Sequence, residues 1–206
     1  MARISTVVFD MGGVLMEWNP LKLARTFTKN DADAELIARE VYGGPEWSLQ
    51  DAGAVSSETV VWTAQRRLPD RLAGAAAEAA RHWYEHRTML PHIGELIRSL
   101  KREGYGIYLL SNAGVQFTEY RHSLPAIDCF DGEVVSAFEH VVKPDLGIFQ
   151  ILCDRYGLKP CECLFVDDTE VNVAAAERAG MQGYLHTGDV EALERHIRSF
   201  GASARR

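Results

Sequence analysis

Residues 6–15 read Thr-Val-Val-Phe-Asp-Met-Gly-Gly-Val-Leu, a short apolar run that ends in an aspartate and a pair of glycines. The run has the length and the β-branched content of a buried strand, and the glycines after it predict a tight loop. Asp10 is therefore expected just beyond the end of a strand. In an open α/β sheet, this is the edge at which ligands bind.

Four later segments have the same character as this strand: residues 106–110, 133–135, 164–166 and 183–185. Helical patterns separate the later ones, over residues 93–103, 148–156 and 171–178. In the first helical pattern, apolar side chains recur on one face, namely Ile93, Leu96, Ile97 and Leu100. The alternation predicts an α/β fold with a doubly wound parallel sheet and crossover helices.

The segment 16–89 differs, because it shows no convincing strand and has helical patterns over residues 21–28, 34–41, 58–67 and 71–87. We predict that residues 1–15 and 90–200 form the α/β core and that residues 16–89 form an inserted all-helical cap. All four tryptophans lie in the cap. Trp62 and Trp83 are interpreted as its internal core. Trp18 and Trp47 lie beside loop signals and are candidates for a substrate pocket.

Composition and charge exclude several kinds of partner. The formal net charge of −7 at pH 7 argues against nucleic acid and anionic membranes, which bind clustered lysines and arginines. No apolar run approaches the roughly 18 residues of a membrane helix, and no signal peptide is recognisable, so a cytoplasmic location is expected. The four cysteines include no C-x-x-C pair and are expected to be reduced. Residues 201–206 are expected to be disordered, and the oligomeric state stays open.

Polar residues that carry chemistry follow the predicted strands in a fixed order. Asp10 follows the first strand, Ser111-Asn112 the second, and Asp167-Asp168 the strand at 164–166, while Lys143 precedes a proline and a helix. Each feature alone has a common structural explanation, such as a turn or a helix cap. Their joint occurrence at the ends of separate strands indicates one active site.

Together these residues meet the needs of phosphoryl transfer, where catalysis is mostly positioning and charge neutralisation. Asp10 can attack phosphorus and form an aspartyl phosphate. Mg²⁺ prefers hard oxygen ligands, which Asp10, one of Asp167 and Asp168, and a backbone carbonyl would supply. Lys143 provides a positive charge for the phosphoryl group, and the Ser111 hydroxyl provides a neutral donor.

The ordered set resembles the four motifs of the haloacid dehalogenase-like (HAD) superfamily: F-D-M-G-G-V-L, L-S-N, V-K-P-D and F-V-D-D-T-E-V-N. The resemblance implies a Rossmann-like core with a helical cap inserted after the first motif. It implies that Asp10 is the nucleophile. It implies that Ser111, Asn112 and Lys143 form the phosphate-binding set, with Asn112 shaping the second loop. By the same resemblance, the Mg²⁺ ligands are Asp10, the Gly12 carbonyl and Asp168, with Asp167 in support.

Within the superfamily, the chain is similar to phosphatases of the glucose-1-phosphate phosphatase type and to the N-terminal phosphatase domain of soluble epoxide hydrolases. This resemblance implies a Mg²⁺-dependent phosphatase that acts on a small phosphorylated metabolite, for example a sugar phosphate. One position departs from the usual phosphatase pattern, because Gly12 stands where a second aspartate acts as general acid and base. Either Glu17 or a good leaving group could compensate, although Glu17 is better interpreted as a solvated loop residue.

Two other functions stay open at this level. A 2-haloacid dehalogenase also uses an aspartate nucleophile and also lacks the second aspartate, but such enzymes need no metal and lack the acidic pair Asp167-Asp168. A weakly catalytic protein that binds a phosphorylated ligand is supported by Gly12 alone. The acidic pair Asp167-Asp168 argues against the dehalogenase, and intact Asp10, Lys143 and Asp168 argue against the binding protein.

Overall fold

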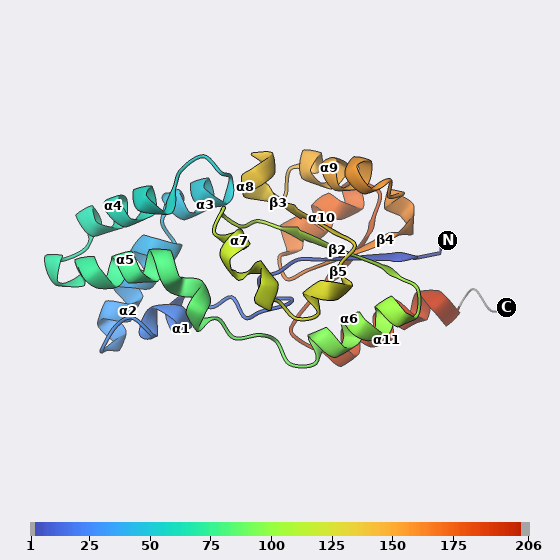
Figure 1. Cartoon of the computed structure of the whole chain (residues 1–206), viewed down its shortest axis with the longest axis horizontal. Coiled ribbons are helices and arrows are strands. Elements are labelled where there is room, and N and C mark those ends of the chain that lie inside the picture. The colour runs from blue at the N-terminus through green and yellow to red at the C-terminus, as the bar shows by residue number, and fades with distance from the viewer. Residues whose placement is uncertain (1–2, 203–206) are drawn as a thin grey trace.

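The computed structural model describes residues 3–202 and contains one five-stranded parallel sheet with the order β3-β2-β1-β4-β5 (Figure 1). The strands match the predicted segments and are up to two residues longer; they are β1 (Thr6–Phe9), β2 (Gly106–Ser111), β3 (Gly132–Val135), β4 (Cys163–Asp167) and β5 (Gln182–Leu185). The predicted α/β class with a helical insertion is confirmed. From β1, the chain adds β2 and β3 on one side of the sheet and then β4 and β5 on the other. The strand order therefore reverses at β1, and open sheets bind ligands at such a point.

Helices cover both faces of the sheet. One face packs against α6 (Ile93–Arg102) and α11 (Val190–Ala202), and the other against α9 (Leu146–Tyr156) and α10 (Glu170–Arg178) (Figure 1). The alternation of side chains along a strand produces these two layers. Val7 and Phe9 of β1 belong to the first buried cluster, whereas Val8 belongs to the second.

The insertion between β1 and β2 is helical, as predicted. It contains α1 (Pro20–Arg25), α2 (Asp31–Ile37), α3 (Pro45–Asp51), α4 (Ser57–Arg67) and α5 (Ala73–His82), with helical turns at Ala38–Tyr42, Asp70–Leu72 and Trp83–His86. Shorter elements after β2 are α7 (Phe117–Tyr120), α8 (Ser136–Glu139) and the turns Arg121–Ser123, Ile127–Cys129 and Pro160–Glu162.

The predicted helices differ from the structure in two places. No helix was predicted over residues 45–51, where Gly43-Gly44-Pro45 gives a loop signal, but Pro45 occupies the first turn of α3, where its missing N–H costs nothing. The single helix expected over residues 71–87 is divided into α5 and two 3₁₀ turns. Of the expected disordered tail, residues 201 and 202 belong to α11, and 203–206 lie outside the described residues.

The insertion leaves the core and returns to it at one place. Met16 and Met89 form an antiparallel bridge. Beside it, the Glu17 N–H donates to the Thr88 carbonyl at 2.8 Å and the Leu90 N–H donates to the Leu15 carbonyl at 3.0 Å. This pairing supports the proposed domain boundaries at residues 16 and 89.

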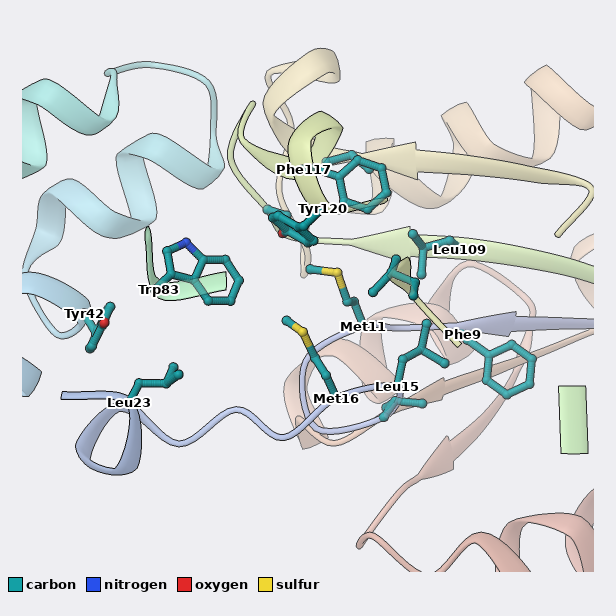
Figure 2. Packing of buried hydrophobic residues seen from close by; sticks show 14 of the residues in the cluster. Phe9, Met11, Leu15, Met16, Leu23, Tyr42, Trp83, Leu109, Phe117 and Tyr120 are labelled. Atoms are coloured by element: carbon teal, nitrogen blue, oxygen red, sulfur yellow. The ribbon is translucent and has the colours of Figure 1, made fainter. Parts of the chain in front are cut away.

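One buried cluster runs from the sheet into the insertion without a break. Met11 and Met16 lie between the core residues around Phe9 and the aromatic side chains Trp83 and Tyr120 (Figure 2). Trp83 is buried, as predicted, but Trp62 is 58% exposed and stacks under Arg66, so its assignment to the internal core was wrong. Among the described residues, no helix combines the length and apolar character needed to cross a membrane.

Candidate active site

A cavity of about 330 Å³ lies where the insertion meets the carboxyl ends of the strands. Its floor contains the residues that the sequence singled out at the strand ends, and its wall is formed by the insertion. The predicted site residues that line it are Asp10, Gly12, Trp18, Trp47, Ser111, Asn112, Lys143 and Asp168. The structure therefore brings together residues from five separate parts of the chain.

Asp10 and Lys143 form the centre of the floor. The Lys143 Nζ lies 2.7 Å from a carboxylate oxygen of Asp10 and 2.7 Å from one of Asp167, and all three side chains are largely or fully buried. Burial raises the pKa of Asp10 to about 6, although the positive charge of Lys143 opposes that rise. The flanking carboxylates raise the pKa of Lys143 above its usual value despite its burial, so the amine stays charged.

Both carboxylate oxygens of Asp167 accept hydrogen bonds. In addition to Lys143, its carboxylate accepts from the Thr169 N–H at 2.8 Å and from the Asn172 side-chain amide at 3.2 Å. Asn172 lies in the first turn of α10 and is itself buried. The carboxylate oxygens of Asp167 are therefore engaged in holding Lys143, and its predicted support of a metal site stays a prediction.

Asp168 lies against the glycine pair of the first loop and is exposed. Gly13 has a φ of +71°, and a Cβ atom there would stand 2.0 Å from an Asp168 carboxylate oxygen and 2.8 Å from its Cβ. Only a glycine at position 13 combines this backbone conformation with such a close approach. The loop Asp10–Gly13 and the end of β4 are therefore shaped to fit each other.

Carboxylate oxygens of Asp10, Asp167 and Asp168 lie within 4.8 Å of one another. Three ionised carboxylates and one ammonium group, that of Lys143, leave a formal charge of −2 in this cluster. Although much of Asp168 is exposed, partial desolvation of its carboxyl group in the cavity and the charge of Asp167 raise its pKa. The donor set consists of hard oxygens and is suited to a divalent cation.

The second loop supplies a hydroxyl group and a positioning side chain. The Ser111 Oγ is buried and has no hydrogen-bond partner among the described residues. The Asn112 side chain instead bonds the backbone of Lys143 twice: it accepts from the N–H at 2.8 Å and donates to the carbonyl at 2.9 Å. The Asn112 side chain thus positions Lys143, and its direct contact with a phosphoryl group stays a prediction.

The sequence matches the haloacid dehalogenase-like hydrolases over residues 4–180. The chain belongs to this family. It is 28% identical to the sesquiterpene phosphatase astK of Aspergillus oryzae, over 88% of this chain and 89% of that protein. A phosphoglycolate phosphatase of Haemophilus influenzae is 25% identical over 84% of this chain and 75% of that protein.

A solved structure has the same fold as this HAD-like hydrolase. A HAD family enzyme of Bacteroides thetaiotaomicron aligns with a TM-score of 0.72 at 22% identity, covering 93% of this chain and 98% of that chain. The same enzyme in complex with magnesium and inorganic phosphate aligns with a TM-score of 0.64 at 21% identity, covering 88% and 93%. The predicted superfamily is confirmed, while the finer likeness to glucose-1-phosphate phosphatases stays a prediction.

The wall of the hydrolase's cavity is aromatic. Trp18 contacts Trp47, Tyr42 and Trp83, with ring centroids 5.4 to 6.0 Å apart. Trp18 and Trp47, the candidates for a substrate pocket, line the cavity, and Trp83, which was interpreted only as core, lines it too. Figure 2 shows Trp83 of the insertion and Tyr120 of α7 near Met11 and Met16 at the junction of insertion and core.

Glu17 lies away from this cavity. Its carboxylate pairs with Lys22, and both residues line a separate small depression beside His86. The interpretation of Glu17 as a loop residue therefore fits the geometry better than its alternative role as an acid.

Sequence reasoning missed several residues of the cavity, namely Tyr42, Gln50, Asp51, Tyr120 and Asn172. Asp51 follows Trp47 by four residues, a spacing that puts both side chains on one face of a helix. That signal was missed because no helix was predicted over residues 45–51. Asn172 falls inside the fourth motif, where only the two aspartates were given a role.

Proposed function

We propose that this hydrolase is a Mg²⁺-dependent phosphatase that cleaves phosphomonoesters through an aspartyl phosphate on Asp10. The observation that carries the proposal is the composition of the cavity floor. It holds a buried carboxylate 2.7 Å from a charged lysine, a buried serine hydroxyl without a partner among the described residues, and an acidic cluster for a cation. Each matches a need of phosphoryl transfer.

In the proposed first step, an Asp10 oxygen attacks phosphorus and the bond to the leaving oxygen breaks. The Lys143 ammonium neutralises charge on the phosphoryl oxygens, and the Ser111 hydroxyl donates a hydrogen bond to one of them. Asp167 and Asn112 hold Lys143 from its side chain and its backbone. In the second step, water attacks the aspartyl phosphate, which regenerates Asp10 and releases inorganic phosphate.

The residues present fit Mg²⁺, because the floor offers three clustered carboxylates with an uncompensated formal charge of −2, and carboxylate oxygens are the hard ligands that this cation prefers. We assign Asp10, the Gly12 carbonyl and Asp168 as ligands, with Asp167 in support. When bound, the cation would neutralise charge on the phosphoryl oxygens and keep the carboxylates ionised. The B. thetaiotaomicron enzyme, which has the same fold, binds magnesium and phosphate.

The same charge pattern disfavours the two other functions. A dehalogenase without a metal would leave Asp167 and Asp168 repelling the nucleophile, with one lysine to balance three carboxylates. A protein that only binds a phosphorylated ligand has no use for a nucleophile placed beside Lys143. The sesquiterpene phosphatase and the phosphoglycolate phosphatase match 88% and 84% of this chain and support the same choice, whereas an (S)-2-haloacid dehalogenase of Burkholderia cepacia matches 65% of it.

The cavity favours an uncharged leaving group. Lys143, already paired with two carboxylates, is the sole cation among its lining residues. A second anionic group on the substrate would therefore find no counter-charge. The aromatic wall offers an apolar surface, and Gln50 and Trp83, which line the cavity, each have one buried polar atom without a partner among the described residues, Oε1 and Nε1. We propose an uncharged alcohol as the product, which a sugar or a terpenoid would satisfy.

A substrate panel tests the function and the substrate class together. With Mg²⁺ we expect hydrolysis of p-nitrophenyl phosphate, a prenyl monophosphate and glucose 1-phosphate. We expect kcat/KM for phosphoglycolate to be at least about tenfold lower, the cost of roughly 1.4 kcal/mol for one unpaired charge. EDTA should abolish activity, and added Mg²⁺ should restore it. Activity that is indifferent to EDTA would contradict the metal assignment, and a preference for phosphoglycolate would contradict the substrate class.

The metal assignment makes a second prediction about the first loop. Asp168→Ala removes a proposed ligand, so the Mg²⁺ concentration for half-maximal activity should rise by at least about tenfold. Gly13→Ala keeps every ligand but forces a Cβ atom into the Asp168 carboxylate, so it should shift the Mg²⁺ dependence in the same direction. Gly104→Ala is a matched control, because Gly104 also has a positive φ but a Cβ atom there meets nothing within 4 Å. If Asp168→Ala and Gly13→Ala needed no more Mg²⁺ for half-maximal activity than Gly104→Ala, the metal assignment would be wrong.

A further inference from the structure

We infer that Asp51, supplied by the helical insertion, is the general acid that protonates the leaving oxygen. The inference rests on the proposed phosphatase function and addresses what that function leaves open: the first loop carries Gly12 where a carboxylate would be expected. Three observations support it, namely the fit between Gly12 and Trp18, the anchoring of Asp51 to the core, and its environment in the cavity.

Gly12 brings no proton donor to the cavity. A Cβ atom at position 12 would stand 3.5 Å from the Trp18 Cβ and 3.8 Å from its Cγ, which is ordinary van der Waals contact, so the first loop packs against the aromatic wall here. With no carboxylate at position 12, the proton donor comes from another part of the cavity.

Asp51 is the last residue of α3 and lines the cavity together with Asp10. Because Asp10, Ser111 and Lys143 lie at the strand ends and the aromatic wall belongs to the insertion, the leaving group must extend from the floor toward the insertion. Asp51 approaches from that side. Glu17, the other acid that the sequence offered, lines a separate depression and is paired with Lys22.

The backbone around Asp51 is fixed to the core. The Asp51 carbonyl accepts a hydrogen bond from the Ser136 hydroxyl, which also accepts from the Ala113 N–H at 3.0 Å. Two residues later, Gly53 has a φ of +68°, and a Cβ atom there would stand 2.2 Å from the Ala137 carbonyl. The backbone of Gly53 thus packs directly against the backbone of Ala137, and this contact holds the end of α3 against α8. The carboxyl group therefore has a defined position relative to the floor.

The surroundings keep a proton on this carboxyl group near neutral pH. Burial is the main cause and raises the pKa of Asp51 to about 7. A hydrogen bond from the Gly114 N–H lowers this pKa by less than burial raises it, and the negative charge of Asp10 adds to the rise. Its place at the carboxyl end of a helix acts in the same direction, because the helix dipole disfavours a negative charge there. A general acid works best with a pKa near the operating pH.

The proton balance follows directly. In the first step, the bond from Asp10 to phosphorus forms, the bond from phosphorus to the leaving oxygen breaks, and that oxygen takes the Asp51 proton to leave as an alcohol. In the second step, the Asp51 carboxylate accepts a proton from the attacking water, and the phosphorus bond to Asp10 breaks. Asp51 ends protonated and ready for the next substrate.

The protonation state gives a pH signature. A carboxyl with a raised pKa holds its proton below about pH 7 and loses it as the pH rises. For alkyl phosphates, kcat/KM should therefore fall above about pH 7. The other titratable groups that face Asp51 are Asp10, Tyr120 and, beside Gly53, His140. Burial raises the pKa of Tyr120 far above this range, so His140→Asn, which suits the left-handed backbone there, is the control for the alkaline limb.

The test compares the parent, Asp51→Asn and Glu17→Gln on 2-phenylethyl phosphate and p-nitrophenyl phosphate at saturating Mg²⁺. In Asp51→Asn we expect a loss of about 10²- to 10⁴-fold on the alkyl ester, because its alkoxide needs the proton. On the aryl ester we expect a stoichiometric burst of p-nitrophenolate at close to the parent rate, followed by slow turnover, because the second step then lacks its base. The alkaline limb should vanish in Asp51→Asn and persist in Glu17→Gln and His140→Asn.

The outcomes separate this inference from the proposed function. Equal loss on both esters in a single turnover, or an alkaline limb that survives in Asp51→Asn, would overturn the role of Asp51 while leaving the phosphatase intact. A parent that hydrolyses neither ester with Mg²⁺ would overturn the phosphatase itself. If Asp51→Asn does not fold, as judged by circular dichroism, the parent protein provides the test. A parent kcat/KM for the alkyl ester that does not fall between about pH 7 and 9 would refute the inference.

Discussion

Asp10→Asn is expected to lower kcat by at least about 10⁴-fold, the scale seen when an enzyme loses its nucleophile. The amide is nearly isosteric with the carboxylate but cannot attack phosphorus. The fold should be kept. Burial already disfavours the charged form of Asp10, as its pKa of about 6 shows, and Lys143 retains Asp167 as its buried partner in the variant. Without metal, the variant should be at least as stable as the parent.

Two measurements check this expectation. Steady-state hydrolysis of p-nitrophenyl phosphate at saturating Mg²⁺ gives the loss of turnover, and urea denaturation in EDTA gives the free energy of unfolding. In the parent, acid quenching during turnover should trap phosphate on the protein, and in Asp10→Asn it should trap none. Residual turnover above about 1% of the parent, in protein free of contaminating phosphatase, would contradict the nucleophile assignment.

The fold could be predicted largely because its signals are local. Strand β1 shows as an apolar run, and the alternation with helices defines a parallel sheet; the topology then brings Asp10, Ser111 and Asp167 to one edge. Lys143 was placed there only by its motif. The structure adds the reason for its position: the Asn112 side chain forms two hydrogen bonds with the Lys143 backbone, and Asp145 caps the helix α9 that follows.

The wall of the cavity was harder to predict, because the insertion's residues meet the floor through tertiary contacts that no local pattern encodes. Trp62 and Trp83 have similar settings in the sequence, yet one is exposed and the other buried at the junction. Asp51 is polar, lies near a glycine and resembles a loop residue. Its environment arises from Ser136, Ala137 and Gly114, more than 60 residues away in the chain.

Lys143→Ala is expected to damage both stability and catalysis, because it removes the one cation from a buried acidic cluster. Asp167 is fully buried and its carboxylate would lose its ionic partner. Breaking a buried ion pair in this way costs about 3–5 kcal/mol of unfolding free energy. Lys159→Ala is the matched control, because that lysine pairs with Glu162 on the surface, and its removal should cost less than about 1 kcal/mol.

A double variant separates the two roles of Lys143. Lys143→Met with Asp167→Asn removes the buried Lys143–Asp167 ion pair, leaves Asp10 as the remaining buried carboxylate, and keeps oxygen and amide groups for Thr169 and Asn172, so part of the lost stability should return in urea denaturation. Turnover of p-nitrophenyl phosphate should not return, because no cation then faces the phosphoryl oxygens. If Lys143→Ala were as stable as Lys159→Ala, the buried pair would not hold the floor together. If the stable double variant hydrolysed phosphate esters at the parent rate, Lys143 would have no part in the chemistry and its place beside Asp10 would be structural alone.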